Sequence, residues 1–239
     1  MFIENLDTEH LLFFLNSIFM FINFIYIFFS SFLIVPKKRL FHYLLCHISL
    51  ISSLAYSMLS TDILTIDYQG KRIQNARYMD WIMNTPIQMI ILGKMGKLSI
   101  PNIYILCFLT IMMIIYGWVG ELIQNPLKWI FFSEGMIVMI PIYIFLFEDF
   151  NYEVVKEFSG DFIARKFYWM GKALLSIWFA YPIIWILDNV NLISPLTVSI
   201  SYSISDFISK FIFTLWIFYC VKNSYYIGET MASLEFDEN

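Results

Sequence analysis

Lys210 and Asp206 are the residues whose types and spacing point most directly to chemistry. Both lie in the last long apolar stretch of the chain, Tyr202–Val221. A charged side chain inside hydrocarbon costs roughly 2.5 to 3.5 kcal/mol on insertion scales, so a lysine there indicates a functional site. On a helix, the four-residue spacing sets the carboxylate beside the amine. A buried lysine beside a carboxylate is also a common way to hold a carbonyl cofactor as a Schiff base.

A second polar stripe lies earlier in the chain, at Asp80, Asn84 and Gln88. The four-residue spacing places the three side chains on one helix face. Arg77 precedes Asp80 by about one turn. If this face meets that of Lys210, two cations and two carboxylates balance, which a membrane interior tolerates. The alternative is an ion-pair cluster that only holds the two helices together.

Aromatic residues gather on the same segments and on one more. Trp178, Tyr181 and Trp185 recur at spacings of three and four, so they share one helix face, and Trp81 follows Asp80 directly. Core packing is one explanation for this face, and a slot for a flat, apolar ligand is the other. Pro182 removes a backbone hydrogen bond from the helix, which predicts a kink there.

The composition indicates which kind of protein positions these residues. Of 239 residues, 59% are hydrophobic and 14% are charged, against about 25% charged in soluble domains. With a mean hydropathy of +0.69, the chain reads as a protein that crosses a membrane several times. The net charge of −4 gives no footprint for nucleic acid. Cys46, Cys107 and Cys220 show no metal-ligand spacing, so we expect no metal site.

Seven stretches are apolar and are long enough, or nearly long enough, to span a bilayer. The expected spans are Leu11–Val35, Leu40–Leu59, Tyr78–Leu92, Ile103–Ile123, Trp129–Phe147, Phe167–Leu187 and Tyr202–Val221. The third is short and is interrupted by Pro86. Lysine and arginine favour the odd-numbered loops, which predicts an extracellular N-terminus and a cytoplasmic C-terminus. We therefore expect an all-α membrane protein, with one seven-helix domain over residues 1–225 and an acidic cytoplasmic tail over residues 226–239.

Three motifs, in this order and on these spans, resemble those of the microbial (type 1) rhodopsins, the bacteriorhodopsin-like family. The segment RYMDWIMNTP begins at Arg77 and resembles the third-helix signature of the family. The segment WFAYPIIW begins at Trp178 and resembles its sixth helix, and DFISK, which ends at Lys210, resembles its seventh. The pairs Met112–Met113 and Gly117–Gly120 resemble the fourth helix. The resemblance covers nearly the whole chain.

The resemblance implies all-trans retinal bound to Lys210 as a protonated Schiff base. Asp80 is then the primary counter-ion and proton acceptor, Asp206 the second counter-ion, and Arg77 the gating arginine on the extracellular side. Of the remaining pocket residues, the tyrosines are expected to hydrogen-bond the carboxylates, the tryptophans to wall the polyene, and Gln88 to tune a blue- to green-absorbing pigment. These expected retinal-binding residues are Tyr56, Trp81, Thr85, Gln88, Met113, Gly117, Gly135, Trp178, Tyr181, Pro182 and Trp185.

Departures from the family pattern decide between functions. Outward pumps of the family carry a cytoplasmic carboxylate where this chain has Ile91, so reprotonation is expected to be slow or to use His42 or His47. The glutamates of extracellular proton release are not evident either, and Asp188 is a possible substitute.

Three functions therefore stay open: a light-driven outward proton pump, which we favour, a light-gated cation channel, and a sensory photoreceptor. None of these is an enzyme. We expect a homo-oligomer, a trimer or pentamer as in the family, embedded in membrane lipid, with protons or monovalent cations as cargo.

Overall fold

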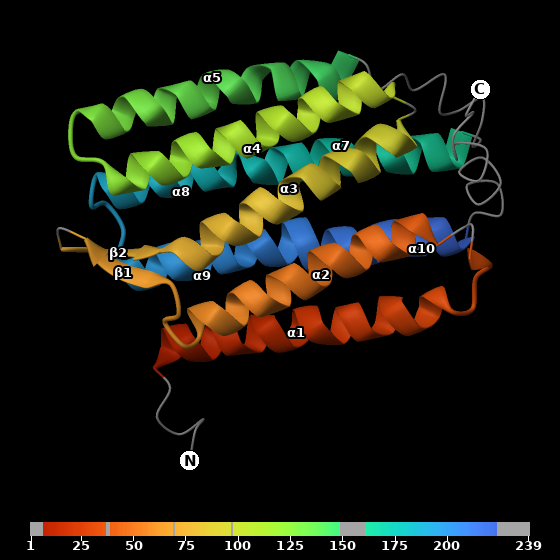
Figure 1. The fold of residues 1–239 in the computed structure, drawn as a ribbon, viewed down its shortest axis with the longest axis horizontal. Helices are drawn as coiled ribbons and strands as arrows, with labels where there is room; N and C mark the ends of the chain where they lie inside the picture. The colour runs from red at the N-terminus through yellow and green to blue at the C-terminus, as the bar shows by residue number, and fades with distance from the viewer. Residues whose placement is uncertain (1–6, 37–38, 69, 97, 149–160, 224–239) are drawn as a thin grey trace.

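The computed structural model describes residues 7–36, 39–68, 70–96, 98–148 and 161–223. The expected acidic tail, residues 226–239, lies outside these ranges, as does most of the polar loop after the fifth span. The described chain is a bundle of long helices that run side by side (Figure 1). A small antiparallel hairpin lies at one end of the bundle, between α2 and α3, and we call this the hairpin end.

Each expected span corresponds to a helix or to a series of helical segments. The first five are α1 (Thr8–Ser31), α2 (Leu40–Leu59), α3 (Asn75–Met95), α4 (Ile100–Leu122) and α5 (Leu127–Glu148). The sixth is built from α7 (Asp161–Trp178) and α8 (Ala180–Asn189), and the seventh from α9 (Pro195–Asp206), the π-helical turn η3 (Phe207–Ile212) and α10 (Phe213–Asn223). The seven-helix bundle predicted from the sequence is confirmed.

Local sequence explains where several of these helices begin. Asp7 precedes α1, and its carboxylate accepts a hydrogen bond from the backbone N–H of His10 at 2.9 Å. Ser99 and Ser194 cap α4 and α9 in the same way. Such side chains satisfy backbone donors that have no partner inside the helix. Pro195 opens α9, a position where its missing N–H costs nothing.

α3 differs in composition from the other helices of the bundle. Six spans of the described chain are long and apolar enough to cross a membrane. α3 is not among them, because it carries the buried polar residues Arg77, Asp80, Asn84 and Gln88. It nevertheless continues through Pro86 as one helix of 21 residues. Pro86 therefore does not interrupt the helix, whereas the expected shortness of the apolar stretch agrees with the absence of α3 from the six apolar spans.

The hairpin was not predicted from the sequence. β1 (Thr65–Tyr68) pairs antiparallel with β2 (Lys71–Gln74), and Gly70 has a φ of 79° in the connecting turn. A φ in this region suits glycine, which has no Cβ. The side chain of Ile73 is buried, whereas β1 is exposed or half-buried. Four-residue strands give too short a hydrophobic alternation to be recognised beside long apolar helices.

Charged contacts tie the hairpin to the helices. Lys71 Nζ lies 2.7 Å from Glu121 Oε2 at the end of α4, and 2.8 Å from Asp188 Oδ2 at the end of α8. Burial alone lowers the pKa of Lys71, but the charge of Glu121 and the hydrogen bonds to both carboxylates outweigh it and raise this pKa above its ordinary value. Asp188, the possible release group, is thus paired with a cation.

The sixth span is interrupted one turn before its proline. Phe179 separates α7 from α8, and its N–H donates to the carbonyl of Ser176, three residues back rather than four. Pro182 has no N–H to donate to Trp178, and its ring crowds the preceding turn. The predicted distortion is therefore present, but it lies at Phe179 and not at Pro182 itself.

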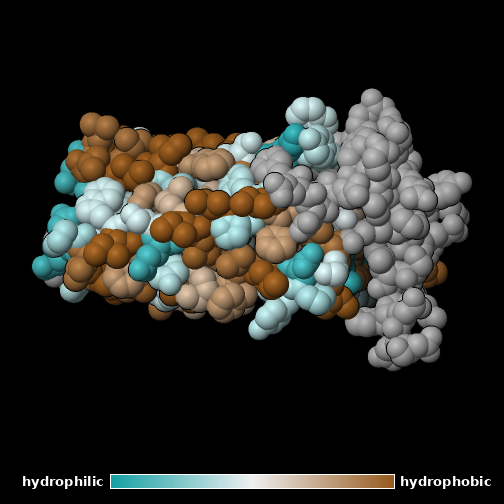
Figure 2. Space-filling model, turned by 90° about the horizontal axis from the view of Figure 1, so that it is seen from above, coloured by the Kyte–Doolittle hydropathy of each residue, from teal (hydrophilic) through white to brown (hydrophobic). Residues whose placement is uncertain are grey.

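The outer surface of the bundle is largely apolar. Figure 2 shows hydrophobic side chains along the length of the visible face, with hydrophilic ones at the hairpin end and at scattered positions elsewhere. Exposed side chains on α1 and α4, such as Phe29 and Tyr104, would be costly in water and are typical of contact with lipid. Polar groups are found instead inside the bundle.

Candidate functional site

Lys210 lies in the middle of the bundle, between two carboxylates. Its Nζ is 2.8 Å from Asp206 Oδ1 and is also hydrogen-bonded to Asp80 Oδ2. The three side chains are 3%, 0% and 1% exposed for Lys210, Asp206 and Asp80. A buried amine without a partner is very unfavourable, and two carboxylates supply the compensating charge. The predicted convergence of the third and seventh spans is therefore present.

Asp206 is held by aromatic donors from three helices. Tyr56 OH donates to Oδ2 at 2.8 Å. Tyr181 OH and Trp81 Nε1 donate to Oδ1 at 2.8 and 3.0 Å. Hydrogen bonds to the ionised form stabilise it, so this carboxylate is set up to remain charged. Tyr56 and Tyr181 were expected to hydrogen-bond the carboxylates, and both bond to Asp206.

Asp80 has a different environment. Its Oδ1 accepts hydrogen bonds from Asn84 Nδ2 at 2.7 Å and Ser52 Oγ at 3.1 Å. Its Oδ2 accepts from Lys210, and no other described residue donates to that oxygen. One oxygen is thus fixed in place, while the other faces the amine and is open to receive a proton.

Arg77 makes no direct ion pair with the described residues of this site. It forms no salt bridge with either carboxylate, although its charge acts on Asp206. Its NH2 group donates to Gln74 Oε1 at 2.6 Å, toward the hairpin end. The guanidinium carbon lies 4.7 Å from the ring centroid of Tyr202, a cation–π distance. Arg77 NH1 is buried with no hydrogen-bond partner among the described residues.

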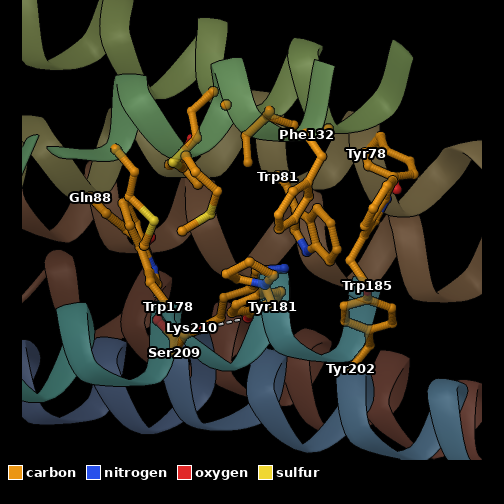
Figure 3. A pocket seen from close by; sticks show the side chains of 18 residues that line it. Tyr78, Trp81, Gln88, Phe132, Trp178, Tyr181, Trp185, Tyr202, Ser209 and Lys210 are labelled. Carbon is orange, nitrogen blue, oxygen red and sulfur yellow. Dashed lines mark hydrogen bonds between the residues drawn. The ribbon is translucent and has the colours of Figure 1, made fainter. Parts of the chain in front are cut away.

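An apolar cavity opens from Lys210 between α3, α4, α5, α7 and α8 (Figure 3). The predicted residues that line it are Trp81, Thr85, Gln88, Met113, Gly117, Gly135, Trp178, Tyr181, Pro182, Trp185 and Lys210. Tyr56 does not line it, because its hydroxyl contacts Asp206 from the far side. The lining residues that the sequence analysis missed are Tyr78, Ile114, Phe132, Met136, Met139, Tyr202 and Ser209. No sequence signal separates Phe132, Met136 and Met139 from their neighbours, because apolar side chains on an apolar helix do not distinguish a cavity face from a lipid face.

Aromatic rings give the cavity flat walls. Trp185 stacks on Phe132 with ring centroids 4.7 Å apart and an interplanar angle of 15°. Nearer Lys210, Trp81 meets Tyr181 edge-on at 5.0 Å. Such pairs hold each other in fixed orientations. The walls therefore favour a long, flat, apolar ligand whose reactive end lies at the amine.

Glycine provides room along the same cavity. A Cβ placed on Gly117 would meet no other atom within 4 Å, so the helix backbone itself borders the open space. A Cβ on Gly135 would lie 3.4 Å from the carbonyl oxygen of Met113, which indicates close approach of α4 and α5. The two glycines thus have different effects, since one leaves space for a ligand and the other lets two helices pack.

Gln88 stabilises the irregular turn that carries Lys210. In η3 the N–H of Phe213 donates to the carbonyl of Ile208, five residues back, and not to Ser209. Gln88 Nε2 donates to the Ser209 carbonyl at 2.7 Å. π-Helical turns are rare and occur frequently at functional sites. Gln88 therefore both lines the cavity and holds the backbone next to the lysine.

Comparison with known proteins places this site in a family. The sequence profile described as "Bacteriorhodopsin-like protein" matches residues 7–224. Opsin-like protein carO of Fusarium fujikuroi is 27% identical over 189 residues, which are 73% of this chain and 61% of that protein. The chain thus spans about three fifths of this curated relative.

Solved structures share the fold at lower identity. A cyanorhodopsin from the cyanobacterium Calothrix has a TM-score of 0.86 at 21% identity, over 96% of this chain and 94% of that one. A light-driven proton pump from Leptosphaeria maculans has a TM-score of 0.84 at 21% identity, over 94% and 97%. Other similar proteins are named as a sensory rhodopsin and a light-driven chloride pump. With this match over nearly its whole length, the chain belongs to the bacteriorhodopsin-like family of microbial rhodopsins and is an integral, multi-pass membrane protein.

Proposed function

We propose that the protein is a light-driven outward proton pump that binds all-trans retinal as a protonated Schiff base on Lys210. The family binds retinal and includes pumps and sensors, which leaves the activity of this chain open. The observation that carries the proposal is the placement of Lys210 between two unequal carboxylates. Asp206 is held by three further donors, whereas Oδ2 of Asp80 contacts the amine alone.

The cavity suits this cofactor. Its lining is mostly aromatic and aliphatic, it ends at a primary amine, and the bare backbone of Gly117 borders open space within it. Trp81, Trp178 and Trp185 are placed to contact a polyene, and Lys210 to form the covalent bond. When bound, retinal supplies absorption of visible light and an isomerisation that turns the N–H bond at Lys210 Nζ away from its partner.

The chain's own residues then move the proton. Lys210 Nζ gives its proton to Asp80 Oδ2, which becomes a neutral carboxylic acid. Ser52 and Asn84 keep Oδ1 in place, so the acceptor does not rotate away. Asp206 stays ionised because its hydrogen bonds favour the charged form. Two carboxylates in different environments thus take different roles.

A polar route leads from the site toward the hairpin end. Arg77 donates to Gln74 Oε1, and Gln74 Nε2 donates to Glu9 Oε1 at 2.9 Å. Glu9 also accepts from Ser199 Oγ at 2.7 Å and from Arg72 NH1 at 3.0 Å. The positive-inside pattern predicts that this end is extracellular. The route therefore supports outward release. Glu9 lies on this route, and the sequence analysis did not identify it as a candidate residue.

A light-gated cation channel is the second candidate, because buried polar side chains line the contacts of α1, α2 and α10. Asn23 Nδ2, for example, donates to Ser49 Oγ at 3.0 Å and to Thr214 Oγ1 at 2.7 Å. The polar stripe on α3 gives a pore little support, because its side chains are already hydrogen-bonded inside the protein. Gln88 is bonded to the Ser209 carbonyl and Asn84 to Asp80 and Ser52.

The test is the photocurrent in voltage-clamped cells supplied with all-trans retinal. We expect an outward current that keeps its sign at every membrane potential, because each photocycle moves charge one way. Cells without added retinal are the control. A current that reverses near the cation equilibrium potential would establish the channel. A coloured pigment at the cell surface without current would establish a sensor.

Filling the cavity at Gly117 should prevent pigment formation without unfolding the protein. We expect Gly117→Leu to reduce the pigment formed with retinal by about tenfold or more, since overpacking a binding space is costly. Glycine in a helix is itself unfavourable by roughly 0.5–1 kcal/mol, so the substitution should not weaken the helix. Absorbance per mole of purified protein is the measurement.

Gly171→Leu is the matched control for this prediction. A Cβ on Gly171 also meets no atom within 4 Å, but this glycine does not line the cavity. The control should form pigment normally. Equal pigment yields from Gly117→Leu and wild type would show that the ligand does not lie against α4.

A further inference from the structure

His42 is a buried imidazole whose two ring nitrogens have no hydrogen-bond partner among the described residues. Its side chain is 0% exposed, and it lies near the beginning of α2, at the end of the bundle opposite the hairpin. The ring meets Phe218 of α10 edge-on, with centroids 5.5 Å apart. Buried polar groups are almost always paired, so an unpaired histidine requires an explanation.

Polar side chains connect the level of His42 with that of Lys210. Asn23 joins α1 to Ser49 on α2 and to Thr214 on α10 through hydrogen bonds of 3.0 and 2.7 Å. Thr214 lies one turn after Lys210, and Ser49 lies two turns after His42. Asn23 Oδ1 is buried and lacks a partner among the described residues. The contact of α1, α2 and α10 therefore holds a group of hydrogen-bonding side chains between the level of His42 and that of Lys210.

The last steps to the site lie on α2 and α3. Ser52 follows Ser49 by about one turn of α2 and accepts from Asn84 Nδ2 at 2.9 Å. Asn84 Oδ1 is a further buried oxygen without a described partner. Ser52 itself donates to Asp80. Unpaired atoms thus recur from the imidazole to the carboxylate, on three helices.

The corresponding half of α3 offers no such groups. Ile91 is 0% exposed and belongs to an apolar cluster with Met89, Leu92 and Leu106. Thr110 of α4 is buried, but its hydroxyl donates to the carbonyl of Cys107 within its own helix. A proton that returns to the site from this end meets the hydrogen-bonding side chains of Asn23, Ser49 and Thr214, which the facing part of α3 lacks. Nearer His42, Leu45 and Ile217 belong to the same apolar cluster as Ile91.

We propose that His42 is the relay residue that returns a proton to Lys210 Nζ from the cytoplasmic end, in place of a carboxylate at Ile91. This rests on the proposed pump function. One ring nitrogen takes a proton from the cytoplasmic side while the other gives its proton toward Asn23 and Ser49. The ring remains neutral overall, and a half-turn about its Cβ–Cγ bond restores the first arrangement of donor and acceptor. Imidazole suits this task because it is both donor and acceptor.

The charges around His42 favour a neutral resting ring. Arg39, three residues earlier, is the charged group that acts on it electrostatically. On α3 the charged residue of the same half is Lys94, and the described side chains of α1 and α10 in that half carry no charge. No described carboxylate faces the ring. A buried imidazole with cations nearby and no anion remains uncharged, as a relay requires.

The experiment is flash photolysis of the retinal-loaded pigment in lipid nanodiscs. We expect His42→Gln to slow the late recovery of the original absorption by about tenfold or more, because general acid–base groups contribute at least that much. His47→Gln is the matched control. His47 lies on the same helix, but it is half-buried and does not belong to the group of Asn23, Ser49 and Thr214. A small diffusible acid, azide, should restore the rate of His42→Gln and leave that of His47→Gln unchanged.

Recovery of His42→Gln within twofold of wild type, with unchanged absorption, would overturn the relay and leave the pump intact. Failure of the pump would appear separately, as absent photocurrent in wild type. A second test keeps His42 in place and follows its imidazole ring by infrared spectroscopy. Replacing His10 and His47 leaves His42 as the sole histidine of the chain. Infrared difference spectra should then show histidine ring bands during recovery, and their absence would also overturn the relay.

Discussion

Lys210→Ala is expected to abolish the visible pigment. The cavity offers no second amine, because Lys210 is the one lysine among its lining residues. Without the ε-amine no covalent bond to the aldehyde of retinal can form, and free retinal absorbs at shorter wavelength. The measurement is the visible absorption spectrum of purified protein after incubation with all-trans retinal. Lys94→Ala, at the end of α3 and outside the cavity, is the control and should form pigment normally.

Folding must be separated from chemistry in this variant. Removing Lys210 leaves Asp80 and Asp206 buried without their cation, and breaking a buried pair costs about 3–5 kcal/mol. Lys210→Arg keeps a positive charge near both carboxylates but cannot form the Schiff base. We expect this variant to fold and to remain colourless. A visible band in Lys210→Arg, or in Lys210→Ala, would mean that the chromophore is attached elsewhere.

Asp80→Asn is expected to shift the absorption to longer wavelength and to stop proton transport. The carboxylate beside Lys210 stabilises the positive charge of the ground state strongly in this buried site. Its removal destabilises the ground state more than the excited state, in which that charge lies farther along the polyene. The amide also cannot take up the proton, so the photocurrent should vanish. Both the spectrum and the current are measured.

Two comparisons sharpen the result for Asp80. Asp188→Asn neutralises a carboxylate at the hairpin end, where it pairs with Lys71, and should leave the absorption unchanged. Asp206→Asn removes the carboxylate that accepts from Tyr56, Tyr181 and Trp81. If Asp206→Asn shifts the spectrum and Asp80→Asn does not, the two carboxylates have exchanged the roles proposed for them.

Local sequence patterns were sufficient to locate most of the candidate site. The spacing of Asp206 and Lys210, and that of Asp80 and Asn84, follows from the helix repeat alone. Because a charge in a membrane helix must be paired, the convergence of these residues could also be expected from their sequence positions. Residues such as Phe132 and Met139 could not be recognised as lining residues, because apolar side chains on an apolar helix give no contrast between the cavity face and the lipid face.

Other features depended on contacts between distant segments. The hairpin is short, and it is tied down by Lys71 through two carboxylates from other helices. The partners of Arg77 also could not be read from the sequence, because its guanidinium contacts Gln74 and the ring of Tyr202. The role of Gln88 beside Ser209 also depends on the π-helical turn, which a regular helix repeat does not predict.

The sequence by itself determined the membrane-spanning bundle, the lysine and the two carboxylates, because hydropathy and helical periodicity act along the chain. Only the tertiary structure decided how the carboxylates differ, since Asp206 takes its donors from α2, α3 and α8 while Asp80 takes its donors from Ser52, Asn84 and Lys210. It also decided that His42 is buried and has no partner among the described residues. Hydrogen bonding inside a bundle depends on which helix faces meet, and that is a property of packing across the whole fold.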